Sequence, residues 1–444
     1  MTSTGIADLD AGVLERLEGY AATFARDFGV ITRTRWAGVY LQGLLLDGER
    51  KSIEPLSRRV RTAGWQGDTE QALQQFVNQS PWDHHTVLRT YRHLMATAFA
   101  TPTGVIVIDD TGFAKKGTHS VGVARQYSGT LGKRDNCQVA VSLHYAAPGG
   151  DYPLLLRLYL PESWTSAPER LAEASVPTAE QVFATKPELA LQLLDQVRAE
   201  GLPHAAVVAD AGYGPSAELR AGLETRGESY VVGLTGEEVV LTEAPTWAVR
   251  PASASRKGRA PERWYLTPEM PTPVAVKTLA QSLARTVVTW RQGAKGPLRG
   301  EFAWVRIWPT PHWQNGRAAA DEPHPATEGR WLLVDWRADG SVKYAISNLP
   351  EFATLEQAVA LWKQRWQVER GYQQLKEELG LDHFEGRSWS GFHHHAALTF
   401  LAYGFLALER QREHRPAITA LEDPTELPPF HRTDPRRKTL RNRY

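Results

Sequence analysis

The segment from Trp362 to Lys376, WKQRWQVERGYQQLK, holds residue types that suit chemistry on phosphate. Its three- and four-residue spacing predicts a helix with seven of its side chains on one face: Trp362, Arg365, Trp366, Glu369, Tyr372, Gln373 and Lys376. A carboxylate between two cations on that face indicates a site that handles metal ions and phosphate. Gly380 is placed to end this helix in a left-handed cap. A surface helix with salt bridges four residues apart would show the same spacing.

Two apolar runs elsewhere in the chain stop abruptly in acid. Residues 104–108, Gly-Val-Ile-Val-Ile, precede Asp109 and Asp110, and residues 205–209, Ala-Ala-Val-Val-Ala, precede Asp210. Runs that are apolar at every position predict strands buried on both faces, as at the centre of an α/β sheet. Ligand sites form at the ends of such strands. An aspartate that caps a helix or begins a turn would give the same pattern.

Three acids on two strands and a helix are sufficient for metal-dependent phosphoryl transfer. Neighbouring carboxylates repel one another, and a cation relieves that repulsion. Mg²⁺ binds through one or two carboxylates and keeps positions for water and phosphate oxygens. Two such ions about 3.5–4 Å apart serve both the attacking and the leaving oxygen of a phosphodiester.

These motifs resemble those of bacterial insertion-sequence transposases of the DDE superfamily. The branch with the signature Tyr-x2-Arg-x3-Glu-x6-Lys is matched by Trp362-x2-Arg365-x3-Glu369-x6-Lys376, with Trp in place of Tyr. Residues 379–383, 110–117 and 126–129 look closest to insertion-sequence family seven hundred and one. The likeness covers roughly residues 30 to 410, and the three acidic motifs are specific only as an ordered set.

The resemblance implies that Asp110, Asp210 and Glu369 hold two Mg²⁺ ions, for which Mn²⁺ can substitute. Asp109 is the rival for the first position, and Asp110 is preferred because the acid in related proteins is commonly followed by Thr. Arg365, Lys376 and Trp362 would contact DNA near the cleaved end, although Trp362 lacks the phenol of Tyr.

The activity implied is cut-and-paste transposition, which is cleavage at the element's ends followed by strand transfer to target DNA. The expected partners are double-stranded DNA and a second copy of the chain in a synaptic complex. No nucleotide is expected, and residues 129–133 are too short for a phosphate-binding loop.

The order of predicted elements agrees with an α/β fold that has a ribonuclease-H-like core. Strands are predicted at 104–110, 136–146 and 153–160, then a helix at 178–200, the Asp210 strand, a helix at 215–226 and a strand at 229–235. Residues 101–235 would form the first part of this core and 351–412 its C-terminal helices. Residues 236–350, rich in Trp, Pro, Thr and Val, predict an inserted β-rich subdomain.

The remaining segments are predicted to contact DNA or to cover the core. Residues 1–100 predict a helical domain that binds DNA ends or packs on the core. Residues 250–300 hold ten Lys/Arg against two Glu, and the tail predicted at 413–444 is also basic. Such patches attract DNA although the whole chain carries a net charge of only +1. Three exposed-hairpin cations are further candidates for the DNA path: Lys115, Lys116 and Arg125.

Composition excludes several other classes of protein. The single cysteine, Cys137, rules out a disulfide framework and fits a reducing bacterial cytoplasm. The longest apolar stretch, 396–408, is too short to cross a bilayer and predicts a buried helix. His393, His394 and His395 point about 100° apart on a helix, so no zinc site is expected. Trp331, Trp336 and Tyr344 are candidates to hold a flipped base.

Two alternatives to an active transposase stay open. A domesticated relative that binds DNA as a regulator would keep the same motifs without cutting. A glycosidase that uses Asp110 and Glu369 as its carboxylate pair would suit the abundant Trp. That chemistry has no need of a third acid, nor of Arg365 and Lys376 beside the glutamate.

Overall fold

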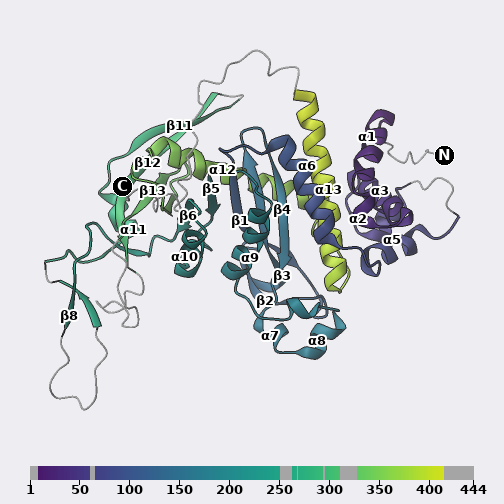
Figure 1. Cartoon of the computed structure of the whole chain (residues 1–444), viewed down its shortest axis with the longest axis horizontal. Coiled ribbons are helices and arrows are strands. Elements are labelled where there is room, and N and C mark those ends of the chain that lie inside the picture. The colour runs from purple at the N-terminus through teal and green to yellow at the C-terminus, as the bar shows by residue number, and fades with distance from the viewer. Residues whose placement is uncertain are drawn as a thin grey trace, which may run out of the picture.

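A computed structural model describes residues 9–60, 66–250, 263–267, 269–293, 296–310 and 328–414. Its centre is a sheet whose core strands are β1 (Val105–Ala114), β2 (Ala124–Ser128), β3 (Lys133–Ala147), β4 (Gly150–Leu158), β5 (Ala206–Ala209) and β6 (Tyr230–Leu234). Strand β1 pairs in parallel with β5, and β5 in parallel with β6, whereas β3 is antiparallel to β1, β2 and β4 (Figure 1). The strands predicted at 104–110, 136–146, 153–160 and 229–235 are thereby confirmed, with shifted ends.

The helices between these strands begin where polar caps allow. They are α7 (Glu162–Thr165), α8 (Pro168–Glu173), the 3₁₀ turn η1 (Thr178–Glu180), α9 (Lys186–Ala199) and α10 (Ala217–Thr225). The helix predicted at 178–200 is split, because Thr185 and Glu188 form a capping box that starts α9 at Lys186. Ser216 caps α10 in the same manner, through the backbone N–H of Leu219.

The predicted insertion continues the core sheet. Its strands are β7 (Val239–Leu241), β10 (Val274–Ala275), β11 (Thr286–Gly293), β12 (Gly296–Pro309), β13 (Arg330–Trp336) and β14 (Val342–Ser347). Strand β14 pairs with β6, so the twelve strands that join in the described residues follow the order β10-β7-β12-β13-β14-β6-β5-β1-β3-β2, with β11 on β12 and β4 on β3. A separate ribbon joins β8 (Trp247–Arg250) to β9 (Arg263–Leu266), and α11 (Val276–Gln281) follows β10.

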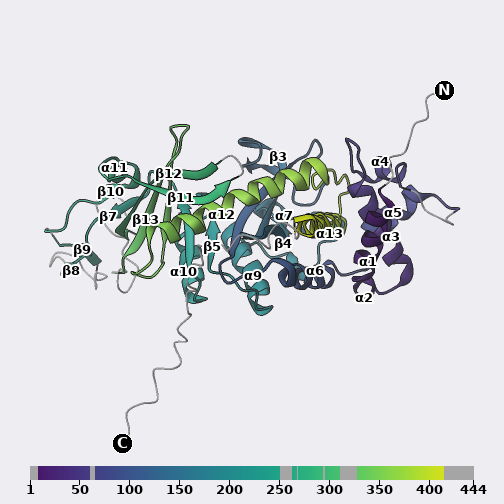
Figure 2. The same ribbon diagram turned by 90° about the horizontal axis from the view of Figure 1, so that it is seen from above.

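One long helix lies across both parts of the sheet. Helix α12 (Leu355–Gln373) starts at a capping box of Thr354 and Gln357 and runs from the insertion strands to the core strands (Figure 2). It continues into η2 (Gln374–Glu378), a π-helical turn. Gly380 follows at φ +70°, so the predicted left-handed cap is confirmed.

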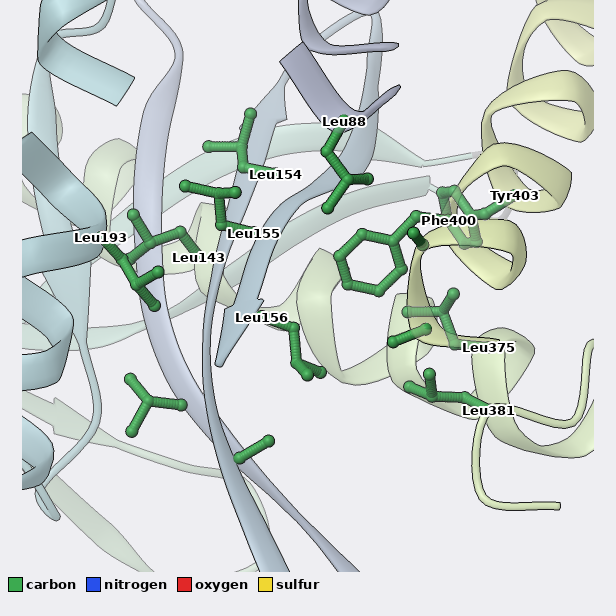
Figure 3. Close-up of a cluster of buried hydrophobic side chains, with 14 of the residues drawn as sticks. Leu88, Leu143, Leu154, Leu155, Leu156, Leu193, Leu375, Leu381, Phe400 and Tyr403 are labelled. Atoms are coloured by element: carbon green, nitrogen blue, oxygen red, sulfur yellow. The ribbon is translucent and has the colours of Figure 1, made fainter. Parts of the chain in front are cut away.

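The N-terminal helices share a core with the rest of the described chain. They are α1 (Ala11–Ala22), α2 (Ala25–Phe28), α3 (Ile31–Leu45), α4 (Ile53–Ser57), α5 (Thr69–Asn78) and α6 (His84–Phe99), and they pack around α13 (Trp389–His414). Figure 3 shows side chains of β3, β4, α6, α9 and α13 meeting in this cluster, among them Leu88, Leu143, Leu193 and Phe400. The stretch 396–408 is buried within α13, as predicted.

Two predictions concern parts of the chain that the structure covers incompletely. Most of the predicted basic tail, and residues 251–262 of the basic stretch, lie outside the described residues. Within the described ranges, no helix combines the length and the apolar character needed to cross a bilayer.

The packing of α13 against the N-terminal helices can be tested at Gly404. A Cβ there would lie 2.4 Å from Cε2 of Tyr91 and 3.0 Å from Oη of Tyr20, and both tyrosines are buried. We expect Gly404→Ala to lower the free energy of unfolding by roughly 1–2 kcal/mol, because the site is already filled. Denaturant titration measures this value.

The matched control is Gly19→Ala in α1, where a Cβ would meet nothing within 4 Å. It should raise stability by roughly 0.5–1 kcal/mol, as expected for Gly to Ala in an exposed helix. Equal effects of the two variants would contradict the packing described here.

Candidate active site

The pairing of β1 with β5 places Asp109 beside Asp210. The two strands run parallel with Ile108 opposite Ala209, and the residue that follows each of these is an aspartate. Successive residues of a strand face opposite sides, so residues two positions apart share a side. Val105 and Val107 of β1, and Ala206 and Val208 of β5, belong to the cluster of buried side chains under α12. By this alternation Asp109 and Asp210 both lie on the face that α12 covers.

Helix α12 carries the other charged groups of this site. The guanidinium of Arg365 donates a hydrogen bond of 2.8 Å to Glu369 one turn later. The Arg365 side chain is only 15% exposed, whereas that of Glu369 is 59% exposed. Arg365 also acts electrostatically on Asp109 and Asp210. A single arginine therefore lies among three carboxylates, which come from two strands and one helix.

Burial, with a smaller contribution from a neighbouring carboxylate, raises the pKa of both strand acids. Burial, followed by the nearby Asp210 carboxylate, raises the pKa of Asp109 to about 7, although the charge of Arg365 works in the opposite direction. Burial also raises the pKa of Asp210, against the hydrogen bond of 2.8 Å that its carboxylate accepts from the Gly212 N–H. Perturbed carboxylates of this kind, gathered in one place, are typical of functional sites.

Asp110 lies on the opposite side of β1 and has a cation of its own. Its neighbours in the alternation, Ile106 and Ile108, face the cluster that contains α9. Lys186, the first residue of α9, donates a hydrogen bond of 2.6 Å to Asp110. The sequence-based preference for Asp110 rested on the threonine that follows it. Asp110 also acts electrostatically on Asp210, so the geometry leaves both Asp109 and Asp110 as candidate partners of Asp210 and Glu369.

The donor set fits a hard divalent cation. Carboxylate oxygens are the ligands such ions take, and a bound cation would stabilise the ionised form of two carboxyls whose pKa burial raises. The acids are not drawn together into a closed cage. Among the described residues, the group whose ligand atoms all lie within 4.8 Å of one another is Asp83, His84 and His85, at the start of α6. Glu369 is hydrogen-bonded to Arg365.

Two predicted DNA-contacting lysines donate hydrogen bonds within the protein. Lys376 donates to the carbonyl of Gly112 at 2.9 Å and to Oγ1 of Thr130 at 3.4 Å, and thereby ties the end of α12 to β1 and to the β2–β3 turn. Lys115 donates to the carbonyl of Phe384 at 2.6 Å. Burial lowers the pKa of both lysines. Their predicted contact with DNA stays a prediction.

Trp362 is also held in the interior, at 5% exposure. Its indole N–H donates to Oδ2 of Asp335 at 3.2 Å, so the signature position has a partner in β13. Its predicted DNA contact is untested. The cations left facing solvent are Lys116 and Arg125, and Arg125 lies on β2 beside the 58% exposed ring of Tyr127.

The three candidates to hold a flipped base lie on the insertion strands. Trp331 stacks on Trp304 at 4.8 Å, and Arg285 lies 4.7 Å over the ring of Trp336. Tyr344 is on β14, and a base-binding role stays a prediction for each.

The rings of the three consecutive histidines of α13 diverge, as expected. His393 is hydrogen-bonded to the backbone of Trp389 and Leu158. His394 is hydrogen-bonded to the backbone of Val77 and Trp82, and His395 to the Tyr40 hydroxyl and the Gly380 carbonyl.

Sequence reasoning missed Lys186 and Asp335 as parts of this region, and it placed Tyr372 on the helix face without a partner. The Tyr372 hydroxyl is hydrogen-bonded to Ser142, the residue opposite Asp109 on β3. Lys186 was recognisable as the start of a helix, because Thr185 and Glu188 flank it as a capping box. Nothing local in the sequence indicated that this helix start would meet Asp110.

Comparison with known families places the chain in a protein family. A family model described as "DDE superfamily endonuclease" matches residues 23–297, which is more than half of the chain. The chain therefore belongs to the DDE superfamily endonuclease family. The match includes Asp109, Asp110 and Asp210 and ends before α12. Glu369 is therefore a candidate through the signature motif and the position of its helix.

Two comparisons with individual proteins align parts of the chain. The chain is 33% identical over 175 residues to "Probable transposase for insertion sequence element IS701" of Microchaete diplosiphon. That alignment covers 39% of this chain and 41% of the relative, so the two correspond over about two fifths of their lengths. Among solved structures, a piggyBac transposase synaptic complex with hairpin DNA aligns with 96% of this chain and 79% of its own, at 11% identity and a TM-score of 0.36.

The raised pKa of Asp109 predicts how stability depends on pH. Between its ordinary value of 3.8 and about 7, the folded chain holds a proton on Asp109 that the unfolded chain releases. The stability from this group is present at low pH and is lost as pH rises through 7. In EDTA, Asp109→Asn should therefore gain roughly 1–3 kcal/mol over wild type between pH 5 and pH 8.

Denaturant titration at both pH values measures this gain. Asp339→Asn is the control, because hydrogen bonds from Ser341 lower the pKa of this exposed carboxyl. It should show no gain as pH rises. A difference between Asp109→Asn and wild type that is constant from pH 5 to 8 would contradict the assigned shift.

Proposed function

We propose that this chain is a DNA transposase of a bacterial insertion sequence, acting in the cytoplasm on double-stranded DNA as a pair of subunits. The observation that carries the proposal is the parallel register of β1 and β5, which puts Asp109 beside Asp210 under the helix of Arg365 and Glu369. Membership of the endonuclease family supports cleavage of DNA, and the similarity to the IS701 protein supports transposition.

We further propose that the core is ribonuclease-H-like. The supporting feature is the strand order β4-β3-β1-β5-β6, in which β1, β5 and β6 are parallel and β3 is antiparallel. Asp109 then lies on β1 and Asp210 directly follows β5, which are the first and fourth of these five strands along the chain. The third acid, Glu369, lies on a helix that covers the sheet. The insertion strands extend the sheet beyond β6.

Asp109, Asp210 and Glu369 would hold the divalent cations, Mg²⁺ or Mn²⁺. When bound, such ions neutralise the phosphate charge and favour ionisation of the attacking oxygen. The protein supplies two carboxylates at the ends of strands and a third on α12, where Arg365 donates a hydrogen bond to Glu369. Lys186 pairs with Asp110, a fourth carboxylate that also acts electrostatically on Asp210.

Two in-line phosphoryl transfers would follow at this site. In the first, a water oxygen bonds to phosphorus, and the 3′-oxygen leaves and takes up a proton. In the second, that 3′-hydroxyl attacks a target phosphodiester, and a new 3′-oxygen leaves. One phosphodiester bond forms for each one broken in the second step, so no nucleotide is consumed.

The exposed cations of the β2–β3 hairpin supply a path for the DNA backbone. Arg125, Lys133 and Arg134 face solvent on its two strands, and the turn between them reaches Asp110 and Lys376. Cations that neutralise phosphates release counterions, so binding should weaken with salt. Tyr127 adds an exposed ring on which a base can stack.

Cleavage of labelled duplex with the gene's own flanking DNA tests the proposal. With Mg²⁺ or Mn²⁺, wild type should cut at the element boundary, and EDTA should prevent it. Asp109→Asn, Asp210→Asn and Glu369→Gln should each lower the rate by roughly 10² or more. Glu377→Gln, on the exposed side of η2, is the matched control and should cut like wild type.

Asp110→Asn separates the two neighbouring aspartates. If Asp109 is the catalytic acid, this variant should keep activity within roughly tenfold of wild type, since it loses only the pair with Lys186. Loss of cleavage in Asp110→Asn with retention in Asp109→Asn would reverse the assignment. Binding of the DNA ends without cutting, in every metal, would favour the regulator.

A further inference from the structure

We propose that Asp335 is a positioning residue that anchors the helix of Glu369 to the insertion strands, a role that rests on the proposed function only in calling Glu369 catalytic. Asp335 lies on β13 and is 2% exposed. Its Oδ2 accepts hydrogen bonds from the Trp362 indole at 3.2 Å and from Lys363 Nζ at 2.7 Å. Arg337 Nε lies 3.7 Å away.

Both donors belong to α12, less than one turn before Arg365 and about two turns before Glu369. Seven residues separate Trp362 from Glu369, which is about 10 Å of helix. Helix α12 also packs on both parts of the sheet, with Val105, Val208 and Leu333 in one buried cluster. Fixing the rotation and the position of α12 at Asp335 therefore fixes where Glu369 lies over Asp109 and Asp210.

The chemistry of the anchor is specific to the residues of this chain. An indole N–H only donates, so Trp at the signature position requires an acceptor, and Asp335 supplies it. The ammonium of Lys363 also lies 4.7 Å from the Trp290 ring and 5.1 Å from the Phe302 ring, on β11 and β12. These contacts hold the cation against three insertion strands.

A buried ion pair gives weak evidence of a stabilising role. Removing both charges often costs little, whereas the hydrogen-bonded geometry of the pair selects one arrangement. Asp335 therefore acts on orientation: a rotation of α12 by one residue, about 100°, would carry Glu369 away from the strand acids. The insertion thereby contributes to catalysis without contacting the reacting atoms.

The first test uses hydrogen–deuterium exchange of the full chain without DNA. Asp335→Asn keeps the shape and removes the charge, so amides of residues 364–379 should exchange roughly tenfold faster than in wild type. The control is Glu228→Gln, which removes another buried carboxylate, bound to Arg198 at 2.7 Å and to His204 at 2.8 Å. It should leave residues 364–379 unchanged. Unchanged exchange in Asp335→Asn would overturn the proposal.

The second test separates positioning from stability by single-turnover cleavage at saturating DNA. Asp335→Asn should lower the cleavage rate roughly tenfold or more and change DNA affinity less than about twofold, whereas Glu228→Gln should keep both values. Trp362→Phe should slow cleavage too, and its combination with Asp335→Asn should be no slower than the slower single variant, since both weaken the same anchor. Equal rates for Asp335→Asn and Glu228→Gln would overturn the anchor.

The two tests also separate this inference from the proposed function. If wild type cuts no DNA, the transposase proposal fails, and the exchange experiment alone decides whether Asp335 anchors α12. If wild type cuts and exchange in 364–379 is unaffected, the transposase proposal stands and the anchor fails.

Discussion

The structure depends on the repulsion between carboxylates brought together at the ends of two buried strands. Parallel pairing of β1 with β5 places Asp109 beside Asp210, and burial by α12 removes the water that would screen them. Burial is the largest cause of the raised pKa of both groups, and a neighbouring carboxylate adds to each, Asp210 for Asp109 and Asp110 for Asp210. Arg365 is the nearest compensation on the covering helix, and it is shared with Glu369. The site is thus prepared for added positive charge.

That requirement explains why α12 has to be placed so securely. The helix covers the acids with its C-terminal half and the insertion strands with its N-terminal half (Figure 2). Because β14 pairs with β6, core and insertion form one sheet, and α12 lies across their junction. The buried contacts of Asp335 hold the middle of the helix, while Lys376 of η2 ties the following turn to β1 and to the β2–β3 turn.

Two groups of basic residues differ in their surroundings. Lys376, Lys115, Lys363 and Lys186 are partly or largely covered and bind carbonyls or carboxylates of the protein. Arg125, Lys133 and Arg134 face solvent on the β2–β3 hairpin. A net charge of +1 is therefore compatible with a local cationic surface, because many of the chain's charges are neutralised internally.

The sequence by itself determined the local features of this protein. Unbroken β-branched runs predicted the strands of Asp109 and Asp210, three- and four-residue spacing predicted α12, and Gly380 marked its end, since each is a short-range consequence of backbone and side-chain geometry. The neighbours of each charge were decided only by tertiary structure. Strand register and alternation separated Asp109 from Asp110, which are adjacent in sequence. Packing of distant strands turned Trp362 toward Asp335, because no local rule connects residues that meet only through the sheet.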